Sequence, residues 1–348
     1  MTHPYASLPA RAFWRSGVAG RTARGLEDVW RPKFAITPAT PIATFGSCFA
    51  QHIGAALRAR AFNWLQTEPP PRALSPDHAK AHGYDLFTCR TGNIYSAKML
   101  RQWTDWAFGR AKPAEEFWES GGRWFDPFRP TIEHGGFASR EEARSLRDFT
   151  RRAFTRAVEG AEIFVFTLGL TEGWRHRNDG YEYQICPGTR EGAFDANAHA
   201  FHNADYGEIL ADLGEAMATM RRANPGLKFL LTVSPVALAA TASGNHVLVA
   251  ATESKAILRA VAGAVVRAHE NVDYFPSYEL VSSAALSGDR FAPDRRNASA
   301  EGVAEVMDVF FASLGAAPAP AREPERTPQA TADARCDEEL LEAFAPRG

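Results

Sequence analysis

A small hydroxyl residue, Ser47, follows a glycine at the point where an apolar run gives way to helical periodicity. The run of residues 41–45 predicts a short buried strand, and Ile53 and Leu57 mark one face of the helix that follows. Enzymes of the α/β class place nucleophiles at such turns, where the first free N–H groups of the helix face any anion that forms. Serine is also a favoured helix N-cap. The spacing therefore leaves two roles open for Ser47, nucleophile or cap.

Polar residues follow three further predicted strands. Gly169, Thr171 and Glu172 follow the strand of residues 162–167, Ser234 follows residues 228–233, and Ser277, Tyr278 and Glu279 follow residues 272–275. Ligands of an open parallel sheet bind beyond the carboxyl ends of its strands. We therefore expect all these residues to meet Ser47 at one edge of the sheet.

Helical segments separate these strands. Amphipathic periodicity predicts helices over residues 140–159, 206–224, 251–269 and 299–316, with Ser299 as the cap of the last. Apolar strands that alternate with helices predict a parallel sheet with helices on both faces. The expected fold class is α/β.

Two other regions depart from this alternation. Residues 66–138 are rich in Trp and Phe, which predicts an aromatic-rich helical insertion that packs as a core, with a lid over the site as the alternative. Residues 317–348 are rich in Pro, Ala, Glu and Arg and are expected to be a disordered tail, in which only Leu340, Leu341 and Phe344 could dock as a short helix. The expected organisation is an N-terminal extension over 1–34, one domain over 35–316 and this tail.

Composition excludes several classes of protein. The 348 residues carry a formal net charge of −2, which gives no electrostatic case for binding nucleic acid or an anionic membrane surface. The four cysteines lie far apart without metal-binding spacing and are expected to be reduced thiols. The sequence shows neither a signal peptide nor a long uncharged apolar run, so we expect a cytoplasmic protein. No cofactor motif is present in the sequence.

The string Gly46-Ser47-Cys48-Phe49-Ala50 resembles the signature of the GSCFA family, a branch of the SGNH/GDSL hydrolases. Four later segments resemble the same family in the same order: residues 92–95, 167–174, 232–236 and 274–279. The resemblance implies an SGNH-like, flavodoxin-type fold with Ser47 as the nucleophile. It implies little about the substrate.

The resemblance also implies an oxyanion hole. In the wider superfamily its donors are the Ser backbone N–H, a Gly backbone N–H and an Asn side chain, which here correspond to Ser47, Gly169 and Asn93. Asn93 is equally compatible with a turn residue after Gly92. Thr171 can donate one further hydrogen bond, whereas an ionised Glu172 would repel an oxyanion.

Three residues are candidates for substrate binding instead. Glu172 suits a substrate hydroxyl or a salt bridge to Arg175, and Tyr278 and Glu279 belong to the last motif at the same edge.

The expected general base is missing. The superfamily carries Asp-x-x-His before its last helix; here Asp294 is present, but Asn297 stands in the place of the His, and an amide cannot act as a base near neutral pH. His246, in the loop after the third strand, is the preferred substitute, with Asp294 as an orienting carboxylate.

Two further alternatives are weaker. His199 and His202 lack a nearby third ligand for a metal ion, so no metal is expected there. Cys48 could be a nucleophile at a helix N-terminus, although its apolar neighbours favour a buried structural thiol.

These observations predict an O-acyl esterase or acyltransferase of SGNH type that uses a serine nucleophile. Its substrate would be a small molecule, with a carbohydrate or another hydroxylated metabolite as the expected class. Because Asn297 replaces the histidine, the alternative is a non-catalytic relative that keeps the fold and binds a ligand or partner.

Overall fold

The computed structural model describes residues 3–315 and 336–345. Its centre is a sheet of four parallel strands in the order β1 (Ile42–Gly46), β4 (Ile163–Leu168), β8 (Lys228–Val233) and β9 (Val272–Tyr274). Each of these strands was predicted from its apolar run. The register pairs Gly46 with Thr167 and Thr167 with Thr232, so the carboxyl ends of the first three strands lie level.

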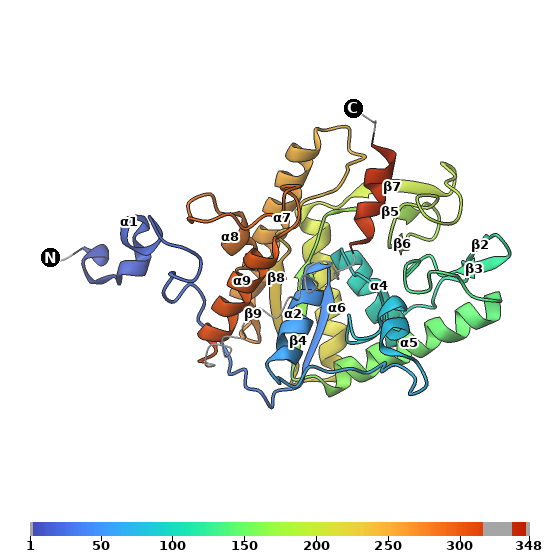
Figure 1. Ribbon diagram of the computed structural model, residues 1–348, viewed down its shortest axis with the longest axis horizontal. Helices are drawn as coiled ribbons and strands as arrows, with labels where there is room; N and C mark the ends of the chain where they lie inside the picture. The colour runs from blue at the N-terminus through green and yellow to red at the C-terminus, as the bar shows by residue number, and fades with distance from the viewer. Residues whose placement is uncertain (1–2, 316–335, 346–348) are drawn as a thin grey trace.

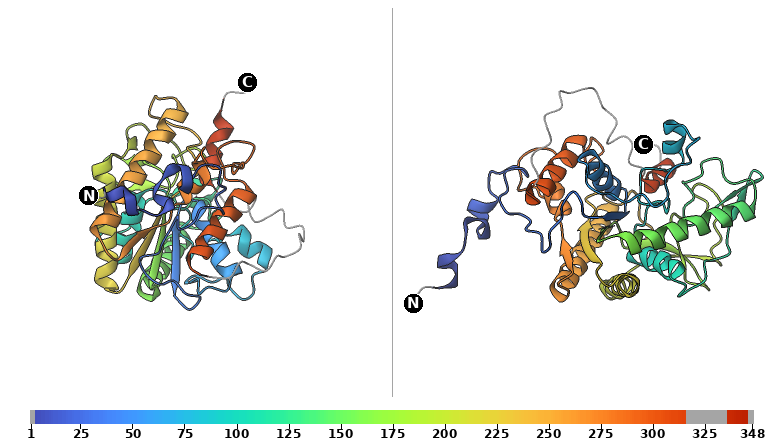
Figure 2. Two further views of the ribbon diagram at one scale, coloured as in Figure 1. Left: turned by 90° about the vertical axis from the view of Figure 1, so that its left-hand side faces the viewer. Right: turned by 90° about the horizontal axis from the view of Figure 1, so that it is seen from below.

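Helices cover both faces of this sheet (Figures 1 and 2). One face packs against α2 (Phe49–Ala59), α8 (Ser277–Ser282) and α9 (Ala300–Ser313) through Ile42, Val165 and Leu230. The other face packs against α4 (Ala97–Ala107), α5 (Arg140–Gly160), α6 (Tyr206–Ala223) and α7 (Val247–Ala268). Side chains of a strand alternate between faces, so the near-continuous apolar strands are buried on both sides. The predicted α/β sandwich is confirmed.

The helix termini follow local signals in the sequence. Ser139 caps α5, Asp205 and Glu208 form a reciprocal capping box at α6, and Ser299 caps α9 as predicted. Helix α7 begins at Val247, one turn earlier than expected. The N-cap of α7 is His246.

The outer edge of β1 carries the remnant of a further strand. Trp64 forms one parallel bridge with Ile42 there, and its indole N–H donates to Thr44 Oγ1 at 2.8 Å. The flavodoxin-like order 2-1-3-4-5 places its second strand at this position. The sheet therefore keeps that order, with its second strand reduced to a single bridge.

The aromatic-rich segment 66–138 joins the main core. It contains α3 (Pro76–Ala81), α4 and a hairpin of β2 (Trp118–Ser120) and β3 (Arg123–Phe125). Trp103 and Trp106 of α4 lie 5.7 Å apart between ring centroids and belong to the same buried cluster as the sheet. The prediction of a packed core is right, but the segment is only partly helical.

A small antiparallel sheet, unpredicted from the sequence, follows β4. It has the order β6 (Glu182–Tyr183), β5 (Glu172–His176) and β7 (His199–Asn203). It lies beside α4 at the carboxyl end of the main sheet (Figure 1). It therefore forms one wall of the region in which the predicted site residues lie.

The two ends of the chain are arranged differently. The N-terminal turns η1 (Pro4–Ser7), η2 (Ala10–Ala12) and α1 (Trp14–Gly17) extend away from the body, whereas Trp30 of the same extension packs against Phe310 of α9 (Figure 1). Part of the predicted tail, residues 317–335 and 346–348, lies outside the described residues.

Residues 336–345, named here the C-terminal segment, form the 3₁₀ helix η3 (Asp337–Phe344) and its flanks. Cys336 and Asp337 are buried against the body. The alternative expected for this part of the tail was a short helix docked through Leu340, Leu341 and Phe344; the helix is present, but its buried residues are Cys336 and Asp337, and Phe344 is exposed. No helix in the described parts of the chain has the length and apolarity to cross a membrane.

Candidate active site

The turn after β1 depends on a glycine. Gly46 has φ +133°, and a Cβ there would lie 2.4 Å from the carbonyl oxygen of Thr167. This close approach lets the chain leave β1 sharply, and the backbone N–H of Ser47 donates to the same Thr167 oxygen at 3.0 Å. The turn therefore delivers Ser47 to the carboxyl edge of the sheet, where it is only 2% exposed.

Ser47 does not cap the helix that follows. The N-cap of α2 is Cys48, and no side chain caps that terminus. The Ser47 Oγ is buried and has no hydrogen-bond partner among the described residues. A buried hydroxyl without a partner is costly, so a hydroxyl kept at this turn needs a reason other than capping.

The predicted oxyanion donors are already engaged. The Ser47 N–H bonds to Thr167, the Gly169 N–H donates to the carbonyl oxygen of Tyr95 at 2.9 Å, and the Thr171 hydroxyl donates to Asn203 Oδ1 at 2.6 Å. These three groups hold the loops in place. As oxyanion donors they remain predictions that require the loops to rearrange.

Asn93 lies differently, because one of its partners comes from the C-terminal segment. Its Nδ2 donates to Asp337 Oδ2 at 2.7 Å and to the Tyr95 hydroxyl at 3.1 Å, and its Oδ1 accepts from Gln51 at 3.0 Å. The Asn93 amide, which the resemblance assigns to oxyanion binding, therefore already donates to the carboxylate of Asp337. The described hydrogen bonds also leave the backbone N–H groups of Cys48 and Phe49, at the start of α2, without an acceptor.

The Asp-x-x-Asn loop of residues 294–297 is closed by an internal hydrogen bond. Asn297 Nδ2 donates to Asp294 Oδ2 at 2.7 Å. Asp294 is exposed, and two backbone N–H groups that donate to it help to hold its pKa below the ordinary value, although its partial burial acts the other way. Asn297, at the position where the resemblance expects a histidine, therefore bonds to the neighbouring carboxylate.

His246 has a local role in the structure. It is exposed, and its Nδ1 accepts from the Leu248 N–H at 3.2 Å, which caps α7. No described hydrogen bond joins it to Ser47. Its assignment as the base stays a prediction, with a cap as its observed role.

The other two histidines of this region also have partners. His199 Nδ1 accepts from the Asp195 N–H at 3.1 Å, and His202 Nε2 lies 2.9 Å from Glu208. Within residues 3–315 and 336–345, no group of three or more His, Cys, Asp or Glu side chains is placed to hold a metal ion.

The predicted substrate-binding residues separate into two places. Glu172 accepts from the Thr241 hydroxyl at 2.6 Å, and burial raises the pKa of its carboxyl. Arg175 does not pair with it but with Glu182 at 3.1 Å. Glu279 is held by Arg259 and by the Tyr274 hydroxyl, and its neighbour Tyr278 is half-buried. These contacts tie α8 to α7 and β9, whereas Glu172 lines a cavity.

That cavity has a volume of about 320 Å³. Its lining is largely apolar, from Tyr95, Leu170 and Trp174 among others, with Glu172 and Gln184 as polar members. The C-terminal segment contributes Glu338, Leu341 and Phe344 to the wall. Largely apolar walls with a few polar groups are typical of small-molecule sites.

Sequence reasoning missed Lys255 on α7. Its side chain is 4% exposed, its Nζ donates to the Gly169 carbonyl at 2.5 Å, and burial lowers its pKa to about 8. Gly169 in turn packs against the nucleophile candidate, since a Cβ on it would lie 3.1 Å from Ser47 Cβ. The signal was present in the sequence, because Lys255 shares the buried stripe of Ala251, Leu258 and Ala262.

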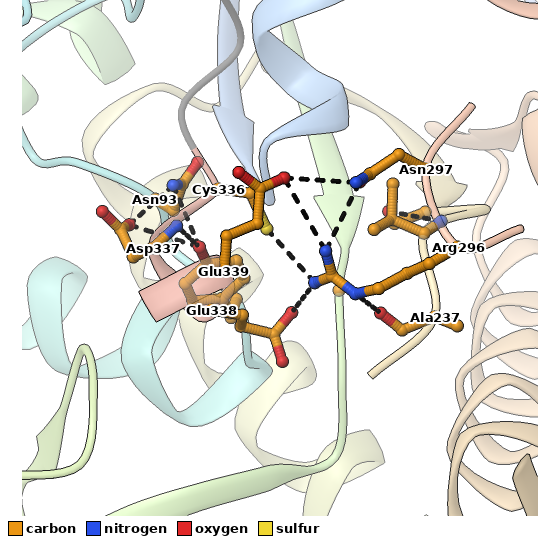
Figure 3. A network of polar contacts seen from close by, with 12 residues as sticks. Asn93, Ala237, Arg296, Asn297, Cys336, Asp337, Glu338 and Glu339 are labelled. Atoms are coloured by element: carbon orange, nitrogen blue, oxygen red, sulfur yellow. Dashed lines mark hydrogen bonds and ion pairs between the residues drawn. The ribbon is translucent and has the colours of Figure 1, made fainter. Parts of the chain in front are cut away.

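Arg296 was missed as well. Figure 3 shows its guanidinium between the Asp-x-x-Asn loop and the C-terminal segment. It donates to the Ala237 carbonyl at 3.1 Å and to Cys336 Sγ at 3.4 Å, and it pairs with Glu338 at 3.5 Å. On the other side of the segment, Asp337 reaches Asn93 (Figure 3). The segment therefore contacts residues from several of the sequence motifs at once.

A family model supplies the classification. The model of the GSCFA family matches residues 41–310. The chain belongs to the GSCFA family. The match covers every strand of the main sheet and the motifs from Ser47 to Asn297, whereas the C-terminal segment lies beyond it. No curated protein matches this GSCFA chain.

Two solved structures resemble it distantly. One is a carbohydrate esterase family 3 protein from Talaromyces cellulolyticus, at 12% identity and a TM-score of 0.35, over 79% of this chain and 96% of that one. The other, from Streptococcus pneumonia, is provisionally described as a platelet activating factor, at 14% identity and a TM-score of 0.28. That match covers 44% of this chain and 60% of the streptococcal chain.

Proposed function

We propose that this GSCFA protein is an SGNH-type O-acyl esterase or acyltransferase in which Ser47 attacks the acyl carbon. The observation that carries the proposal is the Ser47 hydroxyl, buried at a strand-to-helix turn without a partner and without a capping role. Its neighbours at the start of α2, Cys48 and Phe49, offer backbone N–H groups to a developing oxyanion, and Asn93 offers an amide.

We propose Lys255 as the base, because its amine bonds to the Gly169 carbonyl and Gly169 packs against Ser47. A lysine is a base only when it is neutral, and burial lowers the pKa of Lys255 to about 8, so a useful fraction is neutral near pH 7. The neutral amine takes the Ser47 proton as Oγ bonds to the acyl carbon, and returns a proton to the departing alkoxide. Water or an acceptor hydroxyl then removes the acyl group from Ser47.

His246 is the competing base. It requires the loop before α7 to leave its capping position and turn toward Ser47. Asp294 would then act only as a distant carboxylate, because its partner Asn297 fills the position of the superfamily histidine.

The cavity that Glu172 lines supports the proposed substrate class, although Ser47 itself is not among its lining residues. Its apolar wall suits an acyl chain, and Glu172 is placed to accept from a hydroxyl of a carbohydrate or another hydroxylated acceptor. The volume of about 320 Å³ favours a small substrate.

Covalent labelling tests the nucleophile. The purified full chain, kept reduced, is treated with a fluorophosphonate probe and the labelled peptide is mapped. We expect label on Ser47, none in Ser47→Ala, and cleavage of p-nitrophenyl acetate that disappears in the same variant while its circular dichroism spectrum is unchanged. Label elsewhere, or unchanged turnover in Ser47→Ala, contradicts the proposal.

The second candidate function is a non-catalytic binding protein. Two observations favour it: Asn297 in place of the base and the Asp337 carboxylate seated on Asn93. If this function is correct, the fluorophosphonate leaves Ser47 unlabelled. Asn297→His separates the cases further, because activity that appears only in this variant identifies a degraded triad.

A further inference from the structure

The C-terminal segment makes two specific contacts with the proposed site, besides contributing to the wall of its cavity. At its start Cys336 lies against Cys48, the residue next to Ser47, in a buried cluster completed by Val236. One residue later Asp337 bonds to Asn93, and its backbone N–H donates to the Tyr95 hydroxyl at 2.8 Å. The two cysteines are far apart in sequence, so their contact is a property of the fold.

Two neighbours of the buried Cys336 favour its thiolate form, against the opposing effects of burial and of Glu338. The Arg296 guanidinium donates to its Sγ at 3.4 Å. The hydrogen bond from the Cys48 thiol, and then Arg296, lower the pKa of Cys336, while the same contact with Cys336 raises the pKa of Cys48. A cation and a donor beside one sulfur stabilise its thiolate, which is the form that attacks disulfides.

The other two cysteines provide the contrast. Cys89 is buried and burial raises its pKa well above the ordinary value. Cys186 is half-buried, and burial raises its pKa to about 11. Neither has a cysteine neighbour among the described contacts, so both are inert thiols in this structure.

We propose that Cys48 and Cys336 are a redox modification site, which a low-molecular-weight disulfide such as glutathione disulfide converts to an intramolecular disulfide bond. The bond fastens the C-terminal segment beside Ser47. Nothing in the GSCFA match itself requires it, because Cys336 lies outside the matched residues.

The reaction balances in two thiol–disulfide exchanges. When the segment lifts from the body, the Cys336 thiolate attacks glutathione disulfide, which breaks the glutathione S–S bond, forms a mixed disulfide and releases one glutathione. On docking, the Cys48 thiolate attacks Cys336 Sγ and releases the second glutathione. Two protein thiols are oxidised by two electrons, one glutathione disulfide is reduced, and the two protons pass to the departing thiolates.

The consequence for turnover rests on the proposed function. A bond between residues 48 and 336 holds the Asp337 carboxylate on Asn93, where it competes with an oxyanion or a substrate carboxylate. Because a tether raises the local concentration of the segment, we expect ester cleavage to fall roughly tenfold or more on oxidation and to recover with dithiothreitol.

Formation of the Cys48–Cys336 disulfide bond is tested by peptide mapping, which requires no activity measurement. The full chain is equilibrated with mixtures of reduced and oxidised glutathione, alkylated and digested with trypsin without reduction. We expect peptides 34–58 and 336–347 to appear joined, and the count of free thiols to fall from four to two. Cys336→Ser should abolish the joined peptide, and the matched control Cys186→Ser should leave it unchanged.

Two outcomes overturn the proposal. One is a full set of alkylated thiols, or glutathione left on Cys336 without the cross-link, at every ratio tested. The other is a cross-link that uses Cys186 or joins two chains.

The activity arm compares oxidised with reduced protein within each variant. If the disulfide bond forms but fluorophosphonate labelling of Ser47 is unchanged, the proposed effect of the bond on the active site is wrong. A reduced protein that does not label at Ser47 overturns the proposed function instead, while the peptide map still decides the disulfide.

Discussion

Helix α7 carries two candidate bases about two and a half turns apart, and their surroundings are opposite. His246 lies at the exposed first turn, where its ring caps the helix. Lys255 lies on the buried face and donates to the carbonyl oxygen of Gly169, which packs against Ser47. His246 has the residue type expected of a base, whereas Lys255 is linked to Ser47 through Gly169; neither side chain forms a described hydrogen bond with the Ser47 hydroxyl.

The comparison shows that burial can matter more than residue type. A lysine in water holds its proton far above neutral pH, and loss of water around Lys255 lowers its pKa to about 8. The exposed His246 already uses one ring nitrogen to cap the helix. The burial of Lys255 is therefore the reason that we propose it, and not His246, as the base.

Lys255→Met gives the largest expected effect. If Lys255 takes the Ser47 proton, turnover of p-nitrophenyl acetate should fall by about 10²–10⁴-fold, the usual scale of general-base catalysis. Lys255→Arg should fall equally, because a guanidinium keeps the charge but cannot lose its proton. His246→Ala should stay close to wild type. A severe loss in His246→Ala beside an active Lys255→Met would assign the base to the exposed end of α7 instead.

Removing the same lysine should also change how stability depends on pH. The folded-state pKa of Lys255, about 8, lies below its ordinary 10.5, so the unfolded chain binds more protons between these values. The free energy of unfolding of wild type should therefore rise with pH across this window relative to Lys255→Met, by about 3 kcal/mol in total. Well below this window, at about pH 6, Lys255 is protonated in both states of wild type, and the difference should be flat.

Urea unfolding of both proteins at pH 7.5, 9.0 and 10.5 measures this difference. Subtracting the two curves of unfolding free energy against pH removes the contributions of tyrosines and other groups that titrate in the same range. A difference that does not change with pH would show that Lys255 is solvated in solution, which removes the basis of its role.

The sheet of this protein could be predicted from sequence, and much of its site could not. The strands β1, β4 and β8 could be predicted from short, mostly apolar runs, which are typical of strands buried on both faces, and β9 from the shorter run that ends in Tyr274 and Phe275. Their order then brought Ser47, Gly169 and Glu172 to one edge, as expected. Which atoms those residues bond to depends on loop geometry that periodicity does not encode.

The C-terminal segment shows the limit most clearly. Its sequence offers only Leu340, Leu341 and Phe344 as docking residues, yet the residues that are buried are Asp337 on Asn93 and Cys336 on Cys48. Such pairings join residues distant in the chain and are invisible to a local window. Lys255 lies between these two cases. Its place on the buried face of α7 could be predicted from the sequence, but its link to Ser47 through Gly169 could not.

The pH dependence of turnover distinguishes the two bases in wild type. With a base of pKa about 8, only about 3% is neutral at pH 6.5, so the rate there should be about 30-fold below the plateau at pH 9.5. A histidine of ordinary pKa, about 6.5, would give a rate only about twofold below the plateau. The measurement is the rate of p-nitrophenyl acetate cleavage from pH 5.5 to 9.5, with Ser47→Ala subtracted at each pH. A limb near 6.5 would exclude Lys255 as the base.

The smallest expected effect lies at the other end of the comparison. His246→Ala removes the ring nitrogen that accepts from the Leu248 N–H, which leaves one more amide of the first turn of α7 to water. Caps of this kind contribute about 1 kcal/mol, and an exposed one should cost no more than that in urea unfolding. Asn245→Ala is the matched control, because it truncates the adjacent exposed side chain, which forms no described hydrogen bond of its own. A loss of stability in His246→Ala with unchanged ester cleavage would show that His246 acts as a cap. Unchanged stability with lost cleavage would show that His246, and not Lys255, is the general base for Ser47.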